Sequence, residues 1–301
     1  MKFGSLPSIQ GVDFSLPAPN PRSLSQLGRK AAPSFDAYVG LSRWSSTDWI
    51  GHLYPKGTSP SEYLSWYSKA YNTIELNTTH YRIPSIEQVE KWKGAAQPGF
   101  RFCPKIPQII SHARKLIHVR IETRQFLESV AHFQEKMGCC FLQLHESFSP
   151  SLMSNLRQFL DQWSAHIPLA IEFRHPGWFV NQTLSPEIMD LLEGRRISTV
   201  ITDVAGRRDV AHTSLSGTTA MIRLVGNQLN PSDYTRSDAW LERIRLWIDH
   251  GLETLYVFPH QPSDRMASDL GDYLINTLNE TSRQQISGSN GINLGGQLNL
   301  F

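Results

Sequence analysis

Short apolar runs alternate with amphipathic stretches along most of the chain after residue 35. The runs rich in β-branched and aromatic residues predict eight strands, at 37–40, 73–77, 100–105, 139–144, 169–173, 198–202, 220–224 and 254–258. Enough chain separates neighbouring runs for a crossover connection. The pattern therefore predicts an α/β fold, a single (β/α)8 barrel of the TIM type.

The segments between these runs show helical periodicity, with one exception. One predicted helix has an apolar face formed by Phe126, Val130, Phe133 and Met137. Gly138 follows this face as the expected helix stop. Residues 204–219 have no helical period, so we expect an irregular loop or a degenerate helix between the sixth and seventh strands.

Both ends of the chain depart from the barrel pattern. Residues 1–35 are rich in Pro, Ser and Asn, which predicts an N-terminal arm that is mobile or draped over the surface. The barrel is expected over 36–281. Residues 282–301 are rich in Ser, Gly, Asn and Gln, which predicts a flexible C-terminal tail, a linker that carries a terminal peptide.

Composition limits the function classes. A hydrophobic fraction of 40% and a charged fraction of 19% are typical of a globular protein with a sizeable core. A net charge of +2 argues against binding nucleic acid with the whole surface, so any anion site must be local. The sequence lacks an apolar run long enough for a membrane span or a signal-peptide core, which predicts a cytoplasmic protein without a membrane partner.

Polar residues gather where the predicted strands end, which is where TIM-type barrels build their active sites. The candidate catalytic residues are Glu75, Lys105, Glu172 and Asp203. The candidate substrate-binding residues are Arg43, Asn77, His80, Tyr81, Gln143, Arg174, Trp178, Arg223 and His260. A general base in such a site needs a pKa set by burial and by neighbouring charges.

The charges at these strand ends allow two interpretations. Glu75 and Glu172 interrupt apolar strands, where a carboxylate must be paired to be tolerated. The cations Lys105, Arg174 and Arg223 can pair with them, either as a structural plug of the barrel or as a binding site. As a site, the three cations would hold a ligand with phosphate or carboxylate groups.

Histidines near the mouth leave open a divalent metal. They are His80, His145, His175 and His260. Together with the strand-end carboxylates they could supply N and O ligands. The spacing matches no known ligand motif such as HExxH, so the cofactor stays unknown.

Several strand-end segments together resemble the YecE-like family, a domain of unknown function. The match runs from about Tyr38 to Leu278, and its main segments are TIELNTTHYR (73–82), FRFCPK (100–105) and IEFRHPGW (171–178). The resemblance implies a TIM-type barrel with the polar strand ends in a shared pocket, and no established reaction. Its shape is similar to endonuclease IV and the sugar isomerases. His80 and His145 stand where the family usually has Phe and Pro, and His260 belongs to a Pro-His pair that replaces an Asn pair.

The last five residues resemble a second known motif. Gln297, Leu298, Asn299, Leu300 and Phe301 are similar to the pentapeptide by which bacterial polymerases and repair proteins dock on the sliding clamp. The usual third residue of that motif is Ser or Asp. The resemblance implies the bacterial DNA sliding clamp as a partner, with Gln297, Leu298, Leu300 and Phe301 as the partner-binding residues.

Three functional hypotheses follow. The first is a barrel enzyme of the hydrolase or lyase class that acts on a phosphate-bearing substrate, including DNA, in repair or processing through recruitment to the clamp. The second is a small-molecule hydrolase, lyase or isomerase of an anionic metabolite. The third is a non-catalytic module that binds nucleic-acid structure. Clamp binding separates the first from the second, and turnover separates both from the third.

Overall fold

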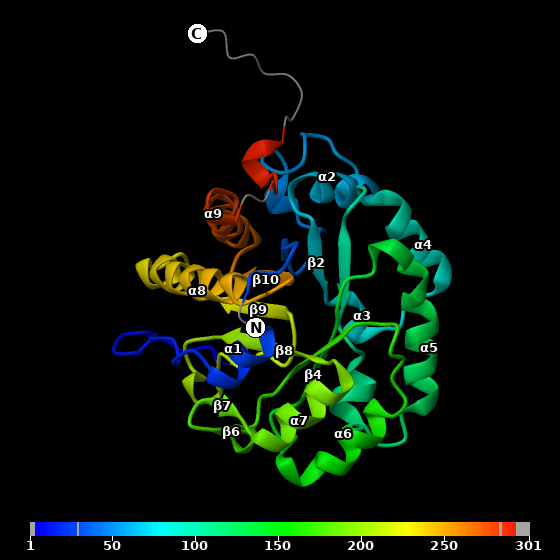
Figure 1. Cartoon of the computed structure of the whole chain (residues 1–301). Helices are drawn as coiled ribbons and strands as arrows, with labels where there is room; N and C mark the ends of the chain where they lie inside the picture. The colour runs from blue at the N-terminus through cyan, green and yellow to red at the C-terminus, as the bar shows by residue number, and fades with distance from the viewer. Residues whose placement is uncertain (1–3, 29, 283–284, 293–301) are drawn as a thin grey trace.

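A computed structural model describes residues 4–28, 30–282 and 285–292 and shows a parallel sheet curled around a central axis, with helices outside it (Figure 1). The strands are β1 (Asp36–Leu41), β2 (Thr73–Leu76), β3 (Arg101–Pro104), β4 (Cys140–Gln143), β5 (Leu169–Glu172), β8 (Ser198–Asp203), β9 (Thr219–Val225) and β10 (Thr254–His260). Their order is β3-β2-β1-β10-β9-β8-β5-β4. Single parallel bridges, Phe102 to Met137 and Lys105 to Phe141, link the two edge strands. The sheet nearly closes, which confirms the predicted barrel.

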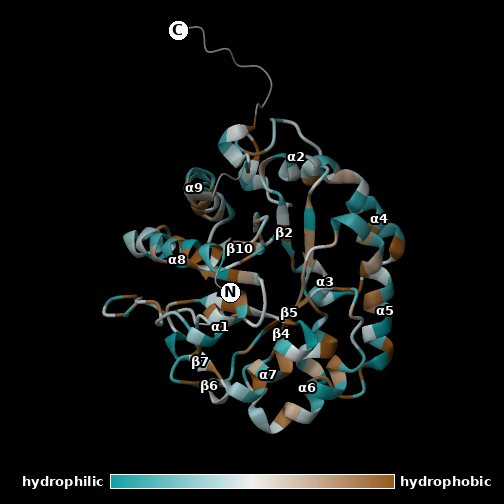
Figure 2. Ribbon diagram, in the orientation of Figure 1, coloured by the Kyte–Doolittle hydropathy of each residue, from teal (hydrophilic) through white to brown (hydrophobic). Residues whose placement is uncertain are grey.

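Helices cover the outside of the barrel between most strands. They are α2 (Tyr63–Ala70), α4 (Ile86–Ala95), α5 (Arg120–Val130), α6 (Met153–Leu160), α7 (Pro186–Arg195), α8 (Pro231–Asp249) and α9 (Asp264–Ser282), while α3 (Thr78–Tyr81) is a single turn at the end of β2. Hydrophilic and hydrophobic residues alternate along them in Figure 2, as expected for helices with one face on a core. A short hairpin, β6 (Phe179–Val180) with β7 (Thr183–Leu184), precedes α7.

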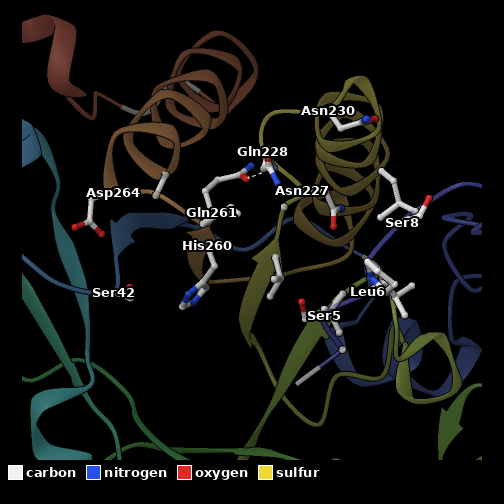
Figure 3. A pocket seen from close by; sticks show the side chains of 18 of the residues that line it. Ser5, Leu6, Ser8, Ser42, Asn227, Gln228, Asn230, His260, Gln261 and Asp264 are labelled. Carbon is white, nitrogen blue, oxygen red and sulfur yellow. Dashed lines mark hydrogen bonds between the residues drawn. The ribbon is translucent and has the colours of Figure 1, made fainter. Parts of the chain in front are cut away.

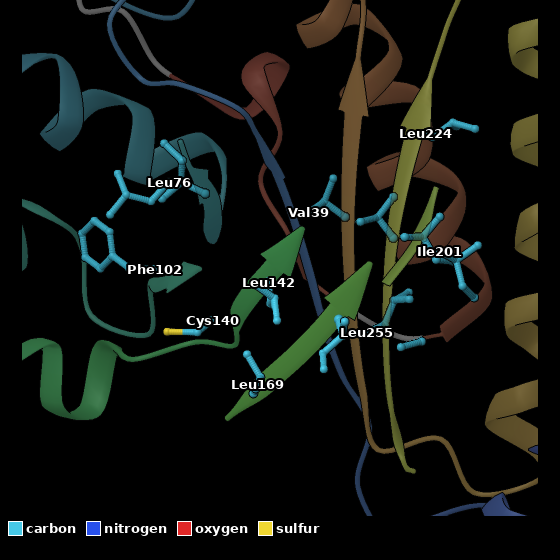
Figure 4. Packing of buried hydrophobic residues seen from close by; sticks show 14 of the residues in the cluster. Val39, Leu76, Phe102, Cys140, Leu142, Leu169, Ile201, Leu224 and Leu255 are labelled. Atoms are coloured by element: carbon cyan, nitrogen blue, oxygen red, sulfur yellow. The ribbon is translucent and has the colours of Figure 1, made fainter. Parts of the chain in front are cut away.

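Strand alternation divides the core into two parts. A small inner cluster, which includes Phe141, Met221 and Phe258, fills the barrel. A larger outer cluster lies between the strands and the helices, and Figure 4 shows its strand residues, among them Leu142 and Ile201. Successive strand residues point to opposite sides, so the inner cluster forms the floor beneath the strand ends.

The helix predicted to run to Met137 is shorter than expected. It ends at Val130, and a tight 3₁₀ turn (η4, Ala131–Lys136) follows, with Gln134 at a φ of 50°. Gly138 does not end a helix. A Cβ at Gly138 would lie 2.8 Å from the Cys103 sulfur, so this glycine allows the close approach that brings β4 beside β3.

The N-terminal arm covers the connection between β8 and β9. This connection contains only a short 3₁₀ turn (η7, Arg208–Val210) in its described residues, so the expected irregular loop is confirmed. The arm's helix α1 (Pro21–Leu27) lies beside it: the Leu215 N–H donates to the Ser23 hydroxyl (2.7 Å), and the Asn20 amide donates to Ser214 (3.0 Å). Of the two expected forms of the arm, the draped one is observed.

Part of the predicted linker is packed on the barrel. The N–H of Gly288 donates to the Ala70 carbonyl (2.9 Å), and the N–H of Ser289 donates to the buried Asp272 carboxylate (2.8 Å). Ile286 is also buried. Specific hydrogen bonds thus place residues 285–292 against the barrel, a contact that their polar composition does not predict. The predicted clamp peptide, 297–301, lies outside the described residues. Among the described helices, none is long and apolar enough to cross a membrane.

Candidate functional site

The strand register decides which polar strand ends reach the barrel interior. Gln143 is paired with Glu172, and Arg223 with Thr202, so each pair lies on the same side of the sheet. Gln143, Glu172 and Arg223 each lie two residues after a member of the inner cluster. Glu75 is paired with Cys103, which is another member of that cluster. Because side chains alternate along a strand, their polar groups lie at the inner, C-terminal end of the barrel, above Phe141.

Arg223 is the centre of this group. Its Nε and Nη2 donate to the two carboxylate oxygens of Glu75 (2.8 and 3.0 Å), which is a bidentate pair. Its Nη1 donates to Glu172 (2.9 Å). All three side chains are at most 2% exposed. One guanidinium thus joins carboxylates from opposite parts of the barrel.

Further donors saturate both carboxylates. Glu75 also accepts from Asn77 (2.8 Å) and pairs with His260 Nε2 (2.9 Å). Burial would raise the pKa of the Glu75 carboxyl, but the charges of Arg223 and His260 outweigh it and hold that pKa well below its ordinary value. Glu75 is therefore held ionised, which does not suit a group that must take up a proton.

Glu172 is held in the same way. It accepts from Arg174 Nε (2.5 Å) and from the Gln143 amide (2.8 Å) in addition to Arg223. Burial would raise its pKa, but Arg174 and then Arg223 outweigh burial and lower the pKa of Glu172 to about 2. The two carboxylates provide a fixed electrostatic frame.

Lys105 is the exception in this frame. It is 8% exposed, yet its ammonium makes no hydrogen bond or salt bridge with any residue that the structure describes. Its Nζ lies 5.8 Å from the centre of the Phe141 ring. Burial, and then the charge of Arg223, lowers the pKa of Lys105 to about 8. Three cations face two carboxylates in this group, which leaves a net charge of +1.

A row of three histidines lines the mouth beside Lys105. The ring centres of His80 and His112 are 5.0 Å apart, and those of His112 and His145 are 5.4 Å apart. Burial and then Lys105 lower the pKa of His80 to about 4, and burial and then His80 lower the pKa of His112 to about 3. Sequence reasoning missed His112, because it lies in a π-helical turn (η3, Ile109–Ala113) several residues past the strand end.

The histidines near the mouth left open a divalent metal, but the described residues do not form a ligand set for one. In that part of the chain, no three His, Cys, Asp or Glu side chains lie close enough together to hold a metal ion. His175 instead accepts the N–H of Gly177 (3.0 Å), and His145 pairs with the Ser147 hydroxyl (2.8 Å).

Asp203 does not join the other candidate catalytic residues. It is paired with Leu224, a member of the outer cluster, so its side chain points to the helix layer. There its carboxylate accepts from Arg236 (3.1 Å) and from the Trp240 indole (2.6 Å), both on α8. The prediction that Asp203 shares the mouth is wrong, because one step along a strand reverses the side on which a side chain lies.

Asp203→Asn should therefore affect stability and leave the mouth unchanged. We expect the free energy of unfolding to fall by about 1–3 kcal/mol, because buried charge-assisted hydrogen bonds are lost. Urea unfolding measures this loss. Phosphate affinity, measured by calorimetry, should stay within about twofold of the native value, since separated sites act independently. Weaker phosphate binding with unchanged stability would contradict this assignment.

The structure also places Trp178 outside the mouth. This side chain is 1% exposed, its indole N–H donates to the Phe148 carbonyl (2.6 Å), and its ring packs on Phe173. The prediction of a substrate-binding tryptophan is wrong, since this indole is part of the core. Tyr81 is 74% exposed, and Arg43 pairs with Asp264 at 3.5 Å, so both lie on the rim.

A cavity of about 910 Å³ adjoins the charged group around Glu75 (Figure 3). Its walls come from the loops after β1, β9 and β10 and from arm residues 4–9, including Ser5 and Leu6. His260 lines the cavity and also pairs with Glu75, so it joins the cavity to the mouth. The composition of the arm predicts no role at a site, because it does not show where the arm lies.

Sequence comparisons find relatives of unknown function. A family model described as "Protein of unknown function DUF72" matches residues 38–291. The "UPF0759 protein YecE" of Escherichia coli K12 is 29% identical over 262 residues, which is 81% of this chain and 93% of that protein. The "UPF0759 protein YunF" of Bacillus subtilis is 29% identical over 163 residues, 49% of this chain and 55% of that protein.

Solved structures share the fold. A DUF72 family protein from Thermotoga maritima superposes with a TM-score of 0.63 at 21% identity, over 81% of this chain and 99% of that chain. One from Enterococcus faecalis superposes with a TM-score of 0.62 at 19% identity, over 85% of this chain and 100% of that chain. With the family model matched across the whole barrel, the chain belongs to the DUF72 family of YecE-like proteins.

Proposed function

We propose that the protein is a barrel enzyme of the hydrolase or lyase class that binds an anionic, phosphate-bearing substrate at the mouth, where Lys105 meets the anion. One observation carries this proposal. Lys105 is a buried cation without a hydrogen bond or salt bridge to any described residue.

The charge balance explains why this observation matters. Removing most of the water around a lysine side chain that has no counter-ion costs free energy, and the lowered pKa of Lys105, about 8, expresses that cost. Glu75 and Glu172 are already engaged by Arg223 and Arg174. A purely structural plug would pair all of its charges. A bound phosphate or carboxylate would instead supply the missing negative charge, with Arg and Lys as its usual partners.

The proposal extends to recruitment by the bacterial sliding clamp. Its support is the resemblance of residues 297–301 to clamp-docking pentapeptides. A protein tethered in this way reaches DNA at high effective concentration without a basic surface, which suits a net charge of +2. If the protein does not bind the clamp, the small-molecule hypothesis explains the mouth equally well. If the protein shows no turnover, the hypothesis of a non-catalytic module explains it.

Removing the unpartnered charge should weaken anion binding. We expect Lys105→Met to lower the affinity for inorganic phosphate and for a 5′-phosphorylated oligonucleotide by about tenfold or more, since a charged hydrogen bond is lost. Calorimetry at low salt measures both affinities. Lys69→Met is the matched control, because Lys69 lies over Trp66 on α2, away from the mouth. Equal binding by native protein and Lys105→Met would refute the proposal.

A further inference from the structure

The Lys105 amine has the setting of a nucleophile as well as that of an anion ligand. We propose that Lys105 forms a covalent imine with the aldehyde of a phosphorylated sugar. This inference rests on the proposed function, because the mouth must first bind the phosphate-bearing substrate.

The backbone around Lys105 is fixed, while its amine is not engaged. The Lys105 N–H donates to the Leu76 carbonyl (3.2 Å), and the Thr79 hydroxyl donates to the Lys105 carbonyl (2.7 Å). The backbone of Lys105 is therefore held in place at the ends of β2 and β3. Its Nζ has no bond to a described residue that an incoming aldehyde would have to break. A positioned, unengaged amine is the requirement for attack on a carbonyl carbon.

Burial and the neighbouring arginines favour the neutral, reactive amine. Burial is the main cause of the lowered pKa of Lys105, the charges of Arg223 and then Arg174 lower that pKa further, and Glu75 and Glu172 oppose them only in part. With a pKa of about 8, about a quarter of the Lys105 amines are neutral at pH ~7.5. An exposed lysine with a pKa of about 10.4 has about one neutral amine in a thousand at that pH. The mouth therefore activates this lysine by desolvation and by cationic neighbours.

The reaction needs no oxidant or reductant. The neutral Nζ attacks the aldehyde carbon, an N–C bond forms, and the electrons of the C=O π bond move to oxygen. A proton passes from nitrogen to that oxygen and gives a carbinolamine. The hydroxyl then takes up a second proton, supplied by the solvent, and leaves as water, and the nitrogen lone pair forms the C=N bond of a protonated imine.

His80 is suited to move these protons. Its Nδ1 lies 2.9 Å from the Ile106 carbonyl oxygen, and because a carbonyl only accepts, Nδ1 carries the proton. Nε2 is then left with a lone pair, and it bonds to no described residue. The low pKa of His80, about 4, keeps this ring neutral at neutral pH. We assign His80 as the group that accepts a proton from the attacking nitrogen.

The surroundings specify the rest of the substrate. The protonated imine again gives this group a net charge of +1, which suits the phosphate, and the adjoining cavity of about 910 Å³ can take the body of the molecule. Polar residues such as Ser42, Asn227 and Gln228 line this cavity, which suits the hydroxyl groups of a sugar. A ring-opened sugar phosphate has this chemistry whether it is free or forms an abasic position in DNA.

Reductive trapping tests the inference. Full-length protein is mixed with ribose 5-phosphate or with an oligonucleotide that contains an abasic position, and cyanoborohydride is added. Hydride then reduces the C=N bond to a stable secondary amine. We expect peptide mass spectrometry to locate the adduct at Lys105, at least about tenfold above any other lysine, with a yield that rises from pH ~7 to ~9. The two substrates distinguish a free sugar phosphate from DNA as the source of the aldehyde.

Two variants complete the test. Lys105→Arg keeps the positive charge, so it should retain phosphate binding and lose the adduct. Lys136→Met is the control, because Lys136 also has a lowered pKa but donates to the carbonyls of Lys93 and Ala96, and its loss should not change trapping. Native protein that binds phosphate but forms no adduct at Lys105 with either substrate would overturn the inference and leave the proposed function standing. Loss of both phosphate binding and trapping would overturn both.

Discussion

Arg223→Ala should lower the free energy of unfolding by about 3–5 kcal/mol, as expected when one partner of a buried ion-pair network is removed. Arg223 is 1% exposed and donates to both Glu75 and Glu172. Its removal leaves two buried carboxylates short of a counter-charge, and the truncation leaves a void above Phe141. Urea unfolding followed by circular dichroism measures the loss.

The pH dependence of stability gives a second measurement of the same network. The pKa of Glu172 is about 2 in the folded protein and 4.5 ordinarily, so this carboxylate stabilises the fold fully above pH 4.5. The stabilisation is lost as the pH falls from there toward 2, and Glu75, whose pKa is also lowered, acts in the same direction. In Arg223→Ala this acid sensitivity should shrink, because the folded pKa values rise toward their ordinary values.

A neutral network is the matched control. The quadruple variant Glu75→Gln, Glu172→Gln, Arg174→Met, Arg223→Met removes both carboxylates and the two guanidinium groups that pair with them, and should regain stability to within about 1–2 kcal/mol of the native protein, since uncharged groups of similar shape need no counter-charge. Such a recovery would show that unpaired charge, and not lost volume, weakens Arg223→Ala. If the quadruple variant is as unstable as the single one, the charged network is not what Arg223 contributes to stability.

The sequence predicted where the strands end, but not on which side each strand-end residue lies. Strands of a parallel barrel are buried on both faces, and residues 199–203 are all buried, so this strand carries no alternation of apolar and polar residues from which to infer a side. The register with β9 places Asp203 with Leu224 on the helix side. Glu75, Glu172 and Arg223 were grouped correctly because a charge within such a run needs partners, and the strand ends supply them.

The residues that the sequence analysis missed or misplaced depend on loops and on distant segments. His112 reaches the mouth through a π-helical turn, and Trp178 turns into the core to satisfy its indole with the Phe148 carbonyl. Neither the position of His112 nor the orientation of Trp178 is indicated by the residues next to it in the sequence. The N-terminal arm shows the same limit, because Pro, Ser and Asn composition gives no reason for Asn20 and Ser23 to pair with 214–215. These contacts join segments about 190 residues apart.

The full-length protein should bind the sliding clamp of its own organism with micromolar affinity, and its last five residues should account for that binding. A short peptide loses conformational entropy when it is ordered on a partner, so tighter binding is not expected. Leu298, Leu300 and Phe301 would enter apolar pockets, while the Gln297 amide would hydrogen-bond at their rim. Replacing Gln297, Leu300 and Phe301 together by Ala should weaken binding about 100-fold or more, because these residues are the anchors.

Calorimetry with the purified clamp measures this difference, and two variants control it. Lys105→Met should bind the clamp as the native protein does, because it alters only the barrel mouth. Asn299→Asp restores a usual third residue of the motif and should bind at least as tightly as the native chain. Native protein that does not bind at about 50 μM, or a triple variant that binds equally well, would remove the support for recruitment to DNA. The mouth would then be best explained as the site of an enzyme that acts on a small anionic metabolite, because the anion site proposed at Lys105 does not depend on whether the anion belongs to DNA.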